Sequence, residues 1–328
     1  WAISVVGAQT QQAHQGYYLR SEPTRPSGFW QPCCRVNTSL NAPVLVMRLY
    51  KYLHPDRIDV LKSGLIRFTP AGGFNDPFDM KPNIHGVHSR KGWDTEFPSA
   101  LDKVIAEQYE ALPPEQRKLM TLDQLKNRIK ANRQSLQDDG YKSLLEITPS
   151  IRKTVESAFD AHIGVLSLTE KPDNLPMWAH YADEHRGFVM EFDATHPFFD
   201  QRVAPSDELR NLQKVQYDTR RPALILADIN SIKPFLIKGC DWEYEQEWRI
   251  LMPLSSANEV RKGTPFDIHL FAFPNDAVKS IILGCRSADI LKTGIVSTIE
   301  VNPEYKNTRL LHARVDDAEY KLNLEELI

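Results

Sequence analysis

Acidic and aromatic residues alternate in one stretch of the C-terminal third, Asp241-Trp242-Glu243-Tyr244-Glu245-Gln246-Glu247-Trp248-Arg249-Ile250-Leu251. If the chain forms a strand from Tyr244 to Met252, its period of two assigns these side chains to two faces. One face carries Trp242, Tyr244, Trp248 and Ile250, and the other carries Glu243, Glu245, Glu247 and Arg249. Neighbouring carboxylates would lie about 7 Å apart, and since like charges repel they need water, a cation or basic partners. The pattern is typical either of a solvated sheet face or of a row of catalytic carboxylates.

Two further stretches carry side chains that can bind a ligand. Trp178 and Tyr181 are three residues apart in a predicted helix, so they lie on adjacent turns of one face. They form either part of the core or a stacking surface for a planar ring, with the Tyr181 hydroxyl as a polar contact. Asn75 and Asp76, in the segment Phe74-Asn75-Asp76-Pro77-Phe78-Asp79, favour a structural turn. The same side chains can instead position a ribose or a phosphate-bearing ligand.

Composition excludes several classes of protein. The 328 residues carry 40 Lys and Arg against 43 Asp and Glu, which leaves a net charge of −3. We therefore expect no dedicated nucleic-acid-binding surface. No apolar run reaches the roughly 18 residues that cross a bilayer, so we expect no membrane contact and a cytoplasmic location. The four cysteines show neither zinc-site spacing nor a disulfide framework.

The chain divides into two regions by composition. Residues 1–46 contain no Lys and a single acid, Glu22, and Met47 is the first methionine. We expect 1–46 to be a disordered or non-native N-terminal extension, with a genuine flexible tail as the alternative. Residues 47–328 are expected to form a single domain.

Within that domain, hydrophobic periodicity predicts an α+β fold with a mostly antiparallel mixed sheet and flanking helices. Strands are predicted at 48–52, 65–69, 163–168, 188–192, 244–252, 268–273 and 280–283, followed by a hairpin that joins 310–315 to 320–324. Helices are predicted at 55–63, 175–186 and 288–299. Residues 97–160, rich in Lys, Glu, Gln and Leu, predict a helical insertion of three or four helices, with Pro113-Pro114 and Gly140 as breakers.

Five motifs, in their order and spacing, resemble the bacterial domain-of-unknown-function family 2971 (DUF2971). They are Leu49-Tyr50-Lys51-Tyr52, Phe74-Asn75-Asp76-Pro77-Phe78, Leu166-Ser167-Leu168, Met177-Trp178-Ala179-His180-Tyr181-Ala182 and Trp242-Glu243-Tyr244-Glu245-Gln246-Glu247-Trp248-Arg249. The resemblance covers most of residues 48–325, and it implies a bacterial protein. No activity is attached to this family.

The order of motifs also resembles the ADP-ribosyltransferase fold, whose enzymes cleave NAD at the nicotinamide–ribose bond. That fold places a polar or aromatic residue on its first strand, a Ser or Thr on a middle strand and a Glu-x-Glu motif at the start of a later strand. Here Tyr50, Ser167 with Thr169, and Glu245-Gln246-Glu247 occupy those places. The sequence departs from the pattern at Tyr50, where that fold usually has His or Arg, and at the imperfect Ser-Leu-Thr match.

The resemblance implies NAD as a substrate and a role for each candidate residue, while the lack of His and Cys ligand spacing predicts no metal. Glu247 would hold the nicotinamide ribose hydroxyl and stabilise the positive charge that develops there, while Glu245 would orient the acceptor. Tyr50 or Tyr181 would stack on nicotinamide, and Arg249 would neutralise phosphate. The remaining cofactor-binding candidates are Asn75, Asp76, Ser167 and Trp178. The partner is then a small-molecule nucleotide, and the macromolecular target stays open.

Two alternatives belong to other classes of function. A metal-dependent hydrolase or nuclease would use carboxylates around a divalent ion, and the candidates are Asp76, Asp79, Glu245 and Glu247. A non-catalytic binding module would use the same motifs only to maintain its structure.

Removal of divalent metals tests the first alternative. Dialysis against EDTA should change neither the circular dichroism spectrum nor the release of nicotinamide from NAD, because the chain lacks His and Cys ligand spacing. Tightly bound, stoichiometric zinc or manganese in the purified protein would instead favour the hydrolase.

Overall fold

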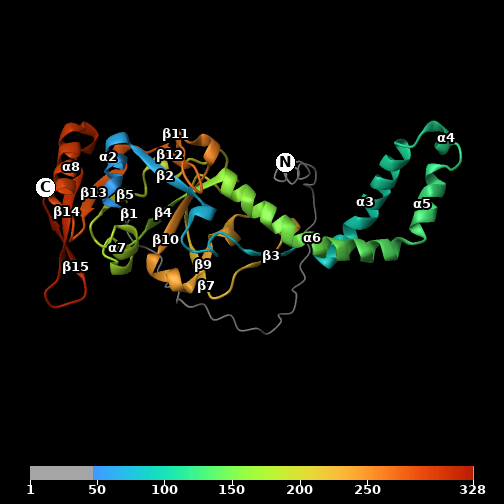
Figure 1. Ribbon diagram of the computed structural model, residues 1–328, viewed down its shortest axis with the longest axis horizontal. Helices are drawn as coiled ribbons and strands as arrows, with labels where there is room; N and C mark the ends of the chain where they lie inside the picture. The colour runs from blue at the N-terminus through green and yellow to red at the C-terminus, as the bar shows by residue number, and fades with distance from the viewer. Residues whose placement is uncertain (1–46, 328) are drawn as a thin grey trace, which may run out of the picture. The chain divides into compact units, whose positions relative to one another are not determined.

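The computed structural model describes residues 47–327, whose helices and strands are drawn in Figure 1. The predicted N-terminal extension, residues 1–46, lies outside the described residues. The strands are β1 (Arg48–Leu53), β2 (Leu65–Pro70), β3 (Asn83–Gly86), β4 (Ile163–Thr169), β5 (Phe188–Asp193), β6 (Leu212–Lys214), β7 (Gln216–Asp218), β8 (Ala223–Ile225), β9 (Ile237–Gly239), β10 (Glu247–Pro253), β11 (Glu259–Arg261), β12 (Ile268–Ala272), β13 (Val278–Leu283), β14 (Arg309–Val315) and β15 (Leu322–Glu326). The helices are α2 (Asp59–Ser63), α3 (Arg90–Glu110), α4 (Pro114–Arg117), α5 (Leu122–Lys130), α6 (Arg133–His162), α7 (Leu175–Tyr181) and α8 (Asp289–Val301).

A large sheet organises the described part of the chain. It has eleven strands: nine join in the order β11-β12-β2-β4-β1-β5-β13-β14-β15, and β10 and β6 extend from the other edge of β4. β13 and β14 run parallel, whereas the neighbours around β1, β4 and β10 run antiparallel. Together with the helices, this sheet confirms the predicted α+β class with a mixed, mostly antiparallel sheet.

Local signals place the short helices next to this sheet. Pro55–Ile58 forms a 3-10 turn that leads into α2, and Gly64 ends the helix at φ 65°, a left-handed conformation that favours glycine. The Asn174 side chain accepts the Met177 backbone N–H and so caps α7. The helix predicted to reach residue 186 ends earlier, at Tyr181.

The helical insertion is confirmed, and it begins before residue 97, at the start of α3. Gly140 was predicted to break a helix, and that prediction is wrong, since it lies inside α6. A Cβ added at Gly140 would come within 2.9 Å of the Trp93 ring, so glycine allows α3 and α6 to pack closely. The insertion therefore uses this glycine for a helix–helix contact and not for a turn.

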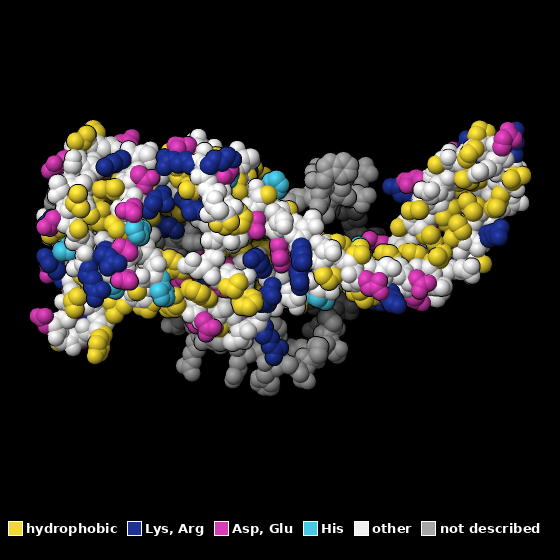
Figure 2. Space-filling model, viewed as in Figure 1, with side chains coloured by type: hydrophobic (Ala, Val, Ile, Leu, Met, Phe, Trp, Pro, Cys, Tyr) yellow, Lys and Arg dark blue, Asp and Glu magenta, His cyan; other side chains and the backbone are white. Residues whose placement is uncertain are grey.

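The insertion also keeps apolar side chains on its surface. The exposed ones are Val104, Leu119, Leu136, Leu145 and Ile147. Figure 2 shows hydrophobic side chains gathering over α3 and α5. Even so, no helix within residues 47–327 has both the length and the apolar character that a bilayer crossing requires.

The sheet forks at β4. One edge of β4 pairs with β10 along its whole length, whereas the other edge pairs with β2 near Val165 and with β1 at Thr169. Ser167 lies between those two contacts, where β1 and β2 separate. A buried carbonyl needs a hydrogen-bond donor, and here the Lys51 ammonium donates to the Ser167 carbonyl oxygen at 2.9 Å. The fork thus brings a lysine to a gap in the sheet.

Alternation along β4 and β10 separates an apolar side of the fork from a polar one. Leu166, Leu168 and Ile250 join a core to which α2 and α8 also contribute. The intervening side chains, Ser167 and Glu247 among them, line a cavity on the other side. Two smaller apolar clusters flank that cavity, one around α7 and one around the end of α6. The polar side chains of the fork are therefore enclosed by packed walls.

Candidate functional site

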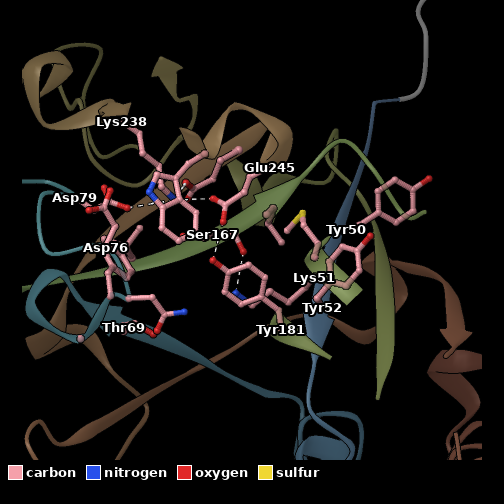
Figure 3. Close-up of a pocket in the computed structure, with 18 residues that line it drawn as sticks. Tyr50, Lys51, Tyr52, Thr69, Asp76, Asp79, Ser167, Tyr181, Lys238 and Glu245 are labelled. Carbon is pink, nitrogen blue, oxygen red and sulfur yellow. Dashed lines mark hydrogen bonds and ion pairs between the residues drawn. The ribbon is translucent and has the colours of Figure 1, made fainter. Parts of the chain in front are cut away.

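A cavity of about 260 Å³ opens at the fork, and Figure 3 shows the side chains that line it. β1, β4, α7, the loop after β2 and the segment that leads into β10 each contribute side chains. The polar lining comprises Tyr50, Lys51, Tyr52, Thr69, Asn75, Asp76, Asp79, Ser167, Tyr181, Lys238, Trp242, Glu245 and Glu247. Segments far apart in the sequence therefore meet at one site.

The acidic stretch does not form the strand predicted from Tyr244. Cys240–Glu245 forms a 3-10 helix, Gln246 adopts a left-handed conformation at φ 43°, and β10 begins only at Glu247. The Thr169 hydroxyl donates to the Glu245 carbonyl, and the Tyr217 hydroxyl accepts the Glu247 N–H at 2.8 Å. This turn directs both carboxylates into the cavity.

Three of the four charged residues on the acidic face are buried, and their charges are paired. Glu245, Glu247 and Arg249 are only 3%, 4% and 0% exposed. The Arg249 guanidinium makes two hydrogen bonds to the Asp79 carboxylate, at 2.8 and 2.7 Å, and two to Glu247, at 2.7 and 2.8 Å. Such bidentate pairs fix the geometry of both partners. The solvated-face interpretation is therefore wrong.

Lys238 lies between three carboxylates. Its Nζ is 2.5 Å from Glu245, 3.0 Å from Glu247 and 3.4 Å from Asp79. It also lies over the Trp242 ring, 5.0 Å from the ring centroid. Burial alone would lower the Lys238 pKa, but the surrounding carboxylates outweigh it and raise the pKa, so Lys238 remains a cation.

The two glutamates experience opposite environments. Burial opposes ionisation of Glu247, but Arg249 and Lys238 outweigh burial, and a Ser167 hydrogen bond adds to them, so the pKa of Glu247 is lowered. For Glu245, burial dominates and the charge of Glu247 adds to it, so the pKa is raised despite Lys238. Carboxylates whose pKa values are pushed apart in this way can take different chemical roles. Glu247 is held as an anion, and Glu245 can exchange a proton.

Glu245 is also the carboxylate with room for a ligand. Its Oε1 accepts the Tyr181 hydroxyl at 2.7 Å and its Oε2 accepts Lys238 at 2.5 Å. Burial and the nearby Glu245 raise the pKa of Tyr181, which therefore stays protonated as a donor. Both Glu247 oxygens already accept guanidinium donors, and one also accepts Lys238.

The cavity has an excess of negative charge. Four carboxylates line it, those of Asp76, Asp79, Glu245 and Glu247. Two cations, Lys51 and Lys238, also line the cavity, and a third, Arg249, is bound to the Asp79 carboxylate. With every group in its ordinary charged form, these seven side chains carry a net charge of −1. Such a site favours a cationic ligand or a reaction that develops positive charge.

Seven of the nine residues predicted for the site line the cavity, and two do not. Trp178 is fully buried, donates to the Pro172 carbonyl at 2.9 Å and packs edge to face on Tyr52. Arg249 lies behind the cavity with its donors bound to carboxylates. Asp76 also closes a turn, since its Oδ1 accepts the Phe78 N–H.

Sequence reasoning missed the two lysines of the cavity. Lys51 lies between two tyrosines in a predicted strand. Because lysine is rarely buried, a single Lys inside such a strand could have indicated a functional residue. Lys238 follows an apolar run and precedes Gly239, and no local pattern connects it to carboxylates that lie up to 159 residues away.

The structure weakens the case for a divalent metal at these carboxylates. The ammonium of Lys238 occupies the place between Asp79, Glu245 and Glu247 where a cation would bind. Within residues 47–327, no group of three or more His, Cys, Asp or Glu is arranged to hold a metal ion.

Comparison with known proteins gives one family match. Residues 177–250 match the family model described as "Protein of unknown function (DUF2971)". This span contains the motif of α7 and the Glu-rich motif before β10, so the predicted resemblance is supported there. No curated protein and no solved structure matches the chain. The likeness to the ADP-ribosyltransferase fold therefore stays a prediction.

Replacement of Glu247 tests the paired network. Glu247→Gln should lower the free energy of unfolding by about 3 kcal/mol or more, because it leaves Arg249 and Lys238 short of a buried partner. The pKa of Glu247 is lowered in the folded protein. The difference in free energy of unfolding between the wild type and Glu247→Gln should therefore have its full size above pH about 4.5, and it should shrink as the pH falls toward that lowered pKa.

Urea denaturation at several pH values measures the difference. The matched control is the exposed Glu300→Gln, which should change the free energy of unfolding by less than about 0.5 kcal/mol. A Glu247→Gln protein as stable as this control would show that the network contributes little.

Proposed function

We propose that the cavity binds the nicotinamide ribose of NAD and breaks the bond between nicotinamide and ribose, in a reaction of the ADP-ribosyltransferase type. The observation that carries this proposal is the pair of carboxylates with opposite environments in one enclosed cavity. Glu247 is a fixed anion, and Glu245 has a raised pKa and a free lone pair on each oxygen. Cleavage of glycosidic bonds typically relies on two carboxylates with different roles.

The charge of the cavity suits this substrate. Nicotinamide in NAD is a pyridinium cation, and as the C–N bond breaks its electron pair goes to the leaving nicotinamide. Positive charge then develops on the ribose as an oxocarbenium ion. With Glu245 ionised, these side chains carry a net charge of −1, so the cavity favours this distribution of charge. The rings of Tyr50, Phe74 and Trp242 line the cavity and offer surfaces for the planar base.

Our proposal gives the two glutamates roles that differ from those implied by the resemblance to ADP-ribosyltransferases. Glu247 is engaged by Arg249 and Lys238, so its part is to hold those cations and to supply a fixed negative field. Glu245 takes the proton of the attacking hydroxyl group or water, and Tyr181 and Lys238 orient its carboxylate. Arg249 does not contact phosphate in this scheme, because its donors are bound to Asp79 and Glu247.

The rest of the dinucleotide extends into a neighbouring cavity. The first cavity, at about 260 Å³, is at the small end of ligand pockets and suits the nicotinamide ribose alone. A second cavity of about 280 Å³ shares Asp76, Lys238 and Trp242 with it. Arg220 and Arg221 line this second cavity and can carry the diphosphate.

Glu245→Gln tests the proposal. It keeps the size of the side chain but removes the base, so nicotinamide release should fall about a hundredfold or more, equivalent to about 3 kcal/mol of barrier. Since the pKa of Glu245 is raised, the wild-type rate should increase with pH through that raised value. The melting curve of Glu245→Gln should stay close to that of the wild type, because Lys238 still has Glu247 and Asp79 as partners.

The measurement is chromatographic quantification of nicotinamide released from NAD, with labelled ADP-ribose followed onto candidate acceptors. Glu300→Gln is the control, because it makes the same change of charge at an exposed site. A wild-type protein that neither binds nor consumes NAD across a broad set of acceptors would rule the proposal out.

A further inference from the structure

We propose that Lys51 is a reactive amine that forms an imine with a small hydroxyaldehyde, such as an open-chain aldose, bound in the same cavity. This activity uses a side chain that NAD cleavage leaves unused. It does not depend on the NAD proposal, because the carbonyl ligand needs only the cavity and the amine.

The backbone position of Lys51 explains why its amine is at the fork. On β1, Tyr50 and Tyr52 join the apolar cluster around α7. Lys51 lies between them in the strand, so its side chain starts from the opposite face of the sheet. Because β1 and β2 separate beside Ser167, the Lys51 side chain fills the gap and lines the cavity. Figure 3 shows it among the other lining residues. A hydrogen bond of 2.9 Å to the Ser167 carbonyl fixes the nitrogen there.

The two lysines of the cavity differ in their partners. Three carboxylates lie within ion-pair distance of Lys238. No carboxylate of residues 47–327 lies within that distance of Lys51, which donates its hydrogen bond to a neutral carbonyl. Lys238 is therefore a structural cation, whereas Lys51 keeps two of its three N–H positions for other contacts.

The surroundings of Lys51 favour its neutral form. Burial lowers its pKa to about 8; Glu247 and Glu245 oppose this effect, and Arg57 and Arg67 add to it. Relative to an ordinary lysine, this value increases the fraction of free amine at pH 7 by a factor of about 300. Lysines activated by desolvation and by neighbouring cations are the ones that form imines with carbonyl compounds.

The reaction balances without an oxidant or a reductant. The lone pair of the Lys51 nitrogen attacks the carbonyl carbon, and a C–N bond forms as the carbonyl oxygen takes up the π electrons and a proton. The C–O bond then breaks and water leaves, which produces a protonated imine. Glu245, with its raised pKa, lines the same cavity and is the group placed to supply and accept these protons. The excess negative charge of the cavity stabilises the cationic imine.

The lining selects a polar aldehyde over an apolar one. Thr69, Asn75 and Ser167 present hydroxyl and amide groups, and the carboxylates of Asp76 and Glu245 can accept hydroxyl donors. The cavity volume of about 260 Å³ suits a molecule of a few carbon atoms. A short hydroxyaldehyde satisfies both constraints.

Reductive trapping tests the proposal directly. The wild-type protein is incubated with glyceraldehyde and sodium cyanoborohydride at pH 8, and the modified lysine is located by peptide mass mapping. We expect a single adduct per chain, on Lys51, at an initial rate about a hundredfold higher than at an exposed lysine such as Lys62. The rate of labelling at Lys51 should rise with pH around a midpoint near 8.

Two variants sharpen the result. Lys51→Arg keeps a cation and a donor for the Ser167 carbonyl but has no nucleophilic amine, so the rapid adduct should disappear. The exposed Lys62→Arg should leave the adduct unchanged. Because the mapping uses the wild-type chain, the result does not depend on whether a variant folds. Labelling of surface lysines with Lys51 unmodified would overturn the proposal, whether or not the protein releases nicotinamide from NAD.

Discussion

The paired charges of Arg249, Lys238, Asp79 and Glu247 are the interaction on which the rest of the site depends. Each ion is buried, and a buried ion without a partner is far more costly than a missing surface contact. Asp79 comes from the loop after β2, Lys238 from β9 and the other two from β10, so the pairing joins three separate segments. The same network fixes Glu247 as an anion and keeps Lys238 beside Glu245.

A fork in a sheet gives this network its place. β4 needs partners on both edges, and where β1 and β2 separate, that edge has no strand partner beside Ser167. A gap of this kind is tolerated only if side chains replace the missing strand. Lys51 does so from one side, and the polar groups of the cavity occupy the space beyond it. The site thus forms where the regular pairing of the sheet stops.

Most strands, and the helical nature of the insertion, could be predicted from the sequence, because alternation and capping residues are local signals. The strands at 48–52, 65–69, 163–168 and 188–192 follow such signals and are present. The Glu-rich stretch could not be predicted in the same way. Its alternation resembles a half-solvated strand, but the left-handed Gln246 breaks the period, and the partners that bury its charges come from distant segments. Lys238 lies 7 residues from Glu245 and Asp79 lies 170 residues from Arg249, and neither separation forms a local pattern.

Of the two glutamates, Glu247 is a permanent anion and Glu245 exchanges protons. Carbon-13 NMR of side-chain carboxylates in glutamate-labelled protein, assigned with Glu245→Gln, measures this directly. We expect Glu245 to titrate clearly above the ordinary glutamate value of about 4.5, while Glu247 stays ionised until acid unfolds the protein. Titration of both carboxylates together near that ordinary value would contradict it.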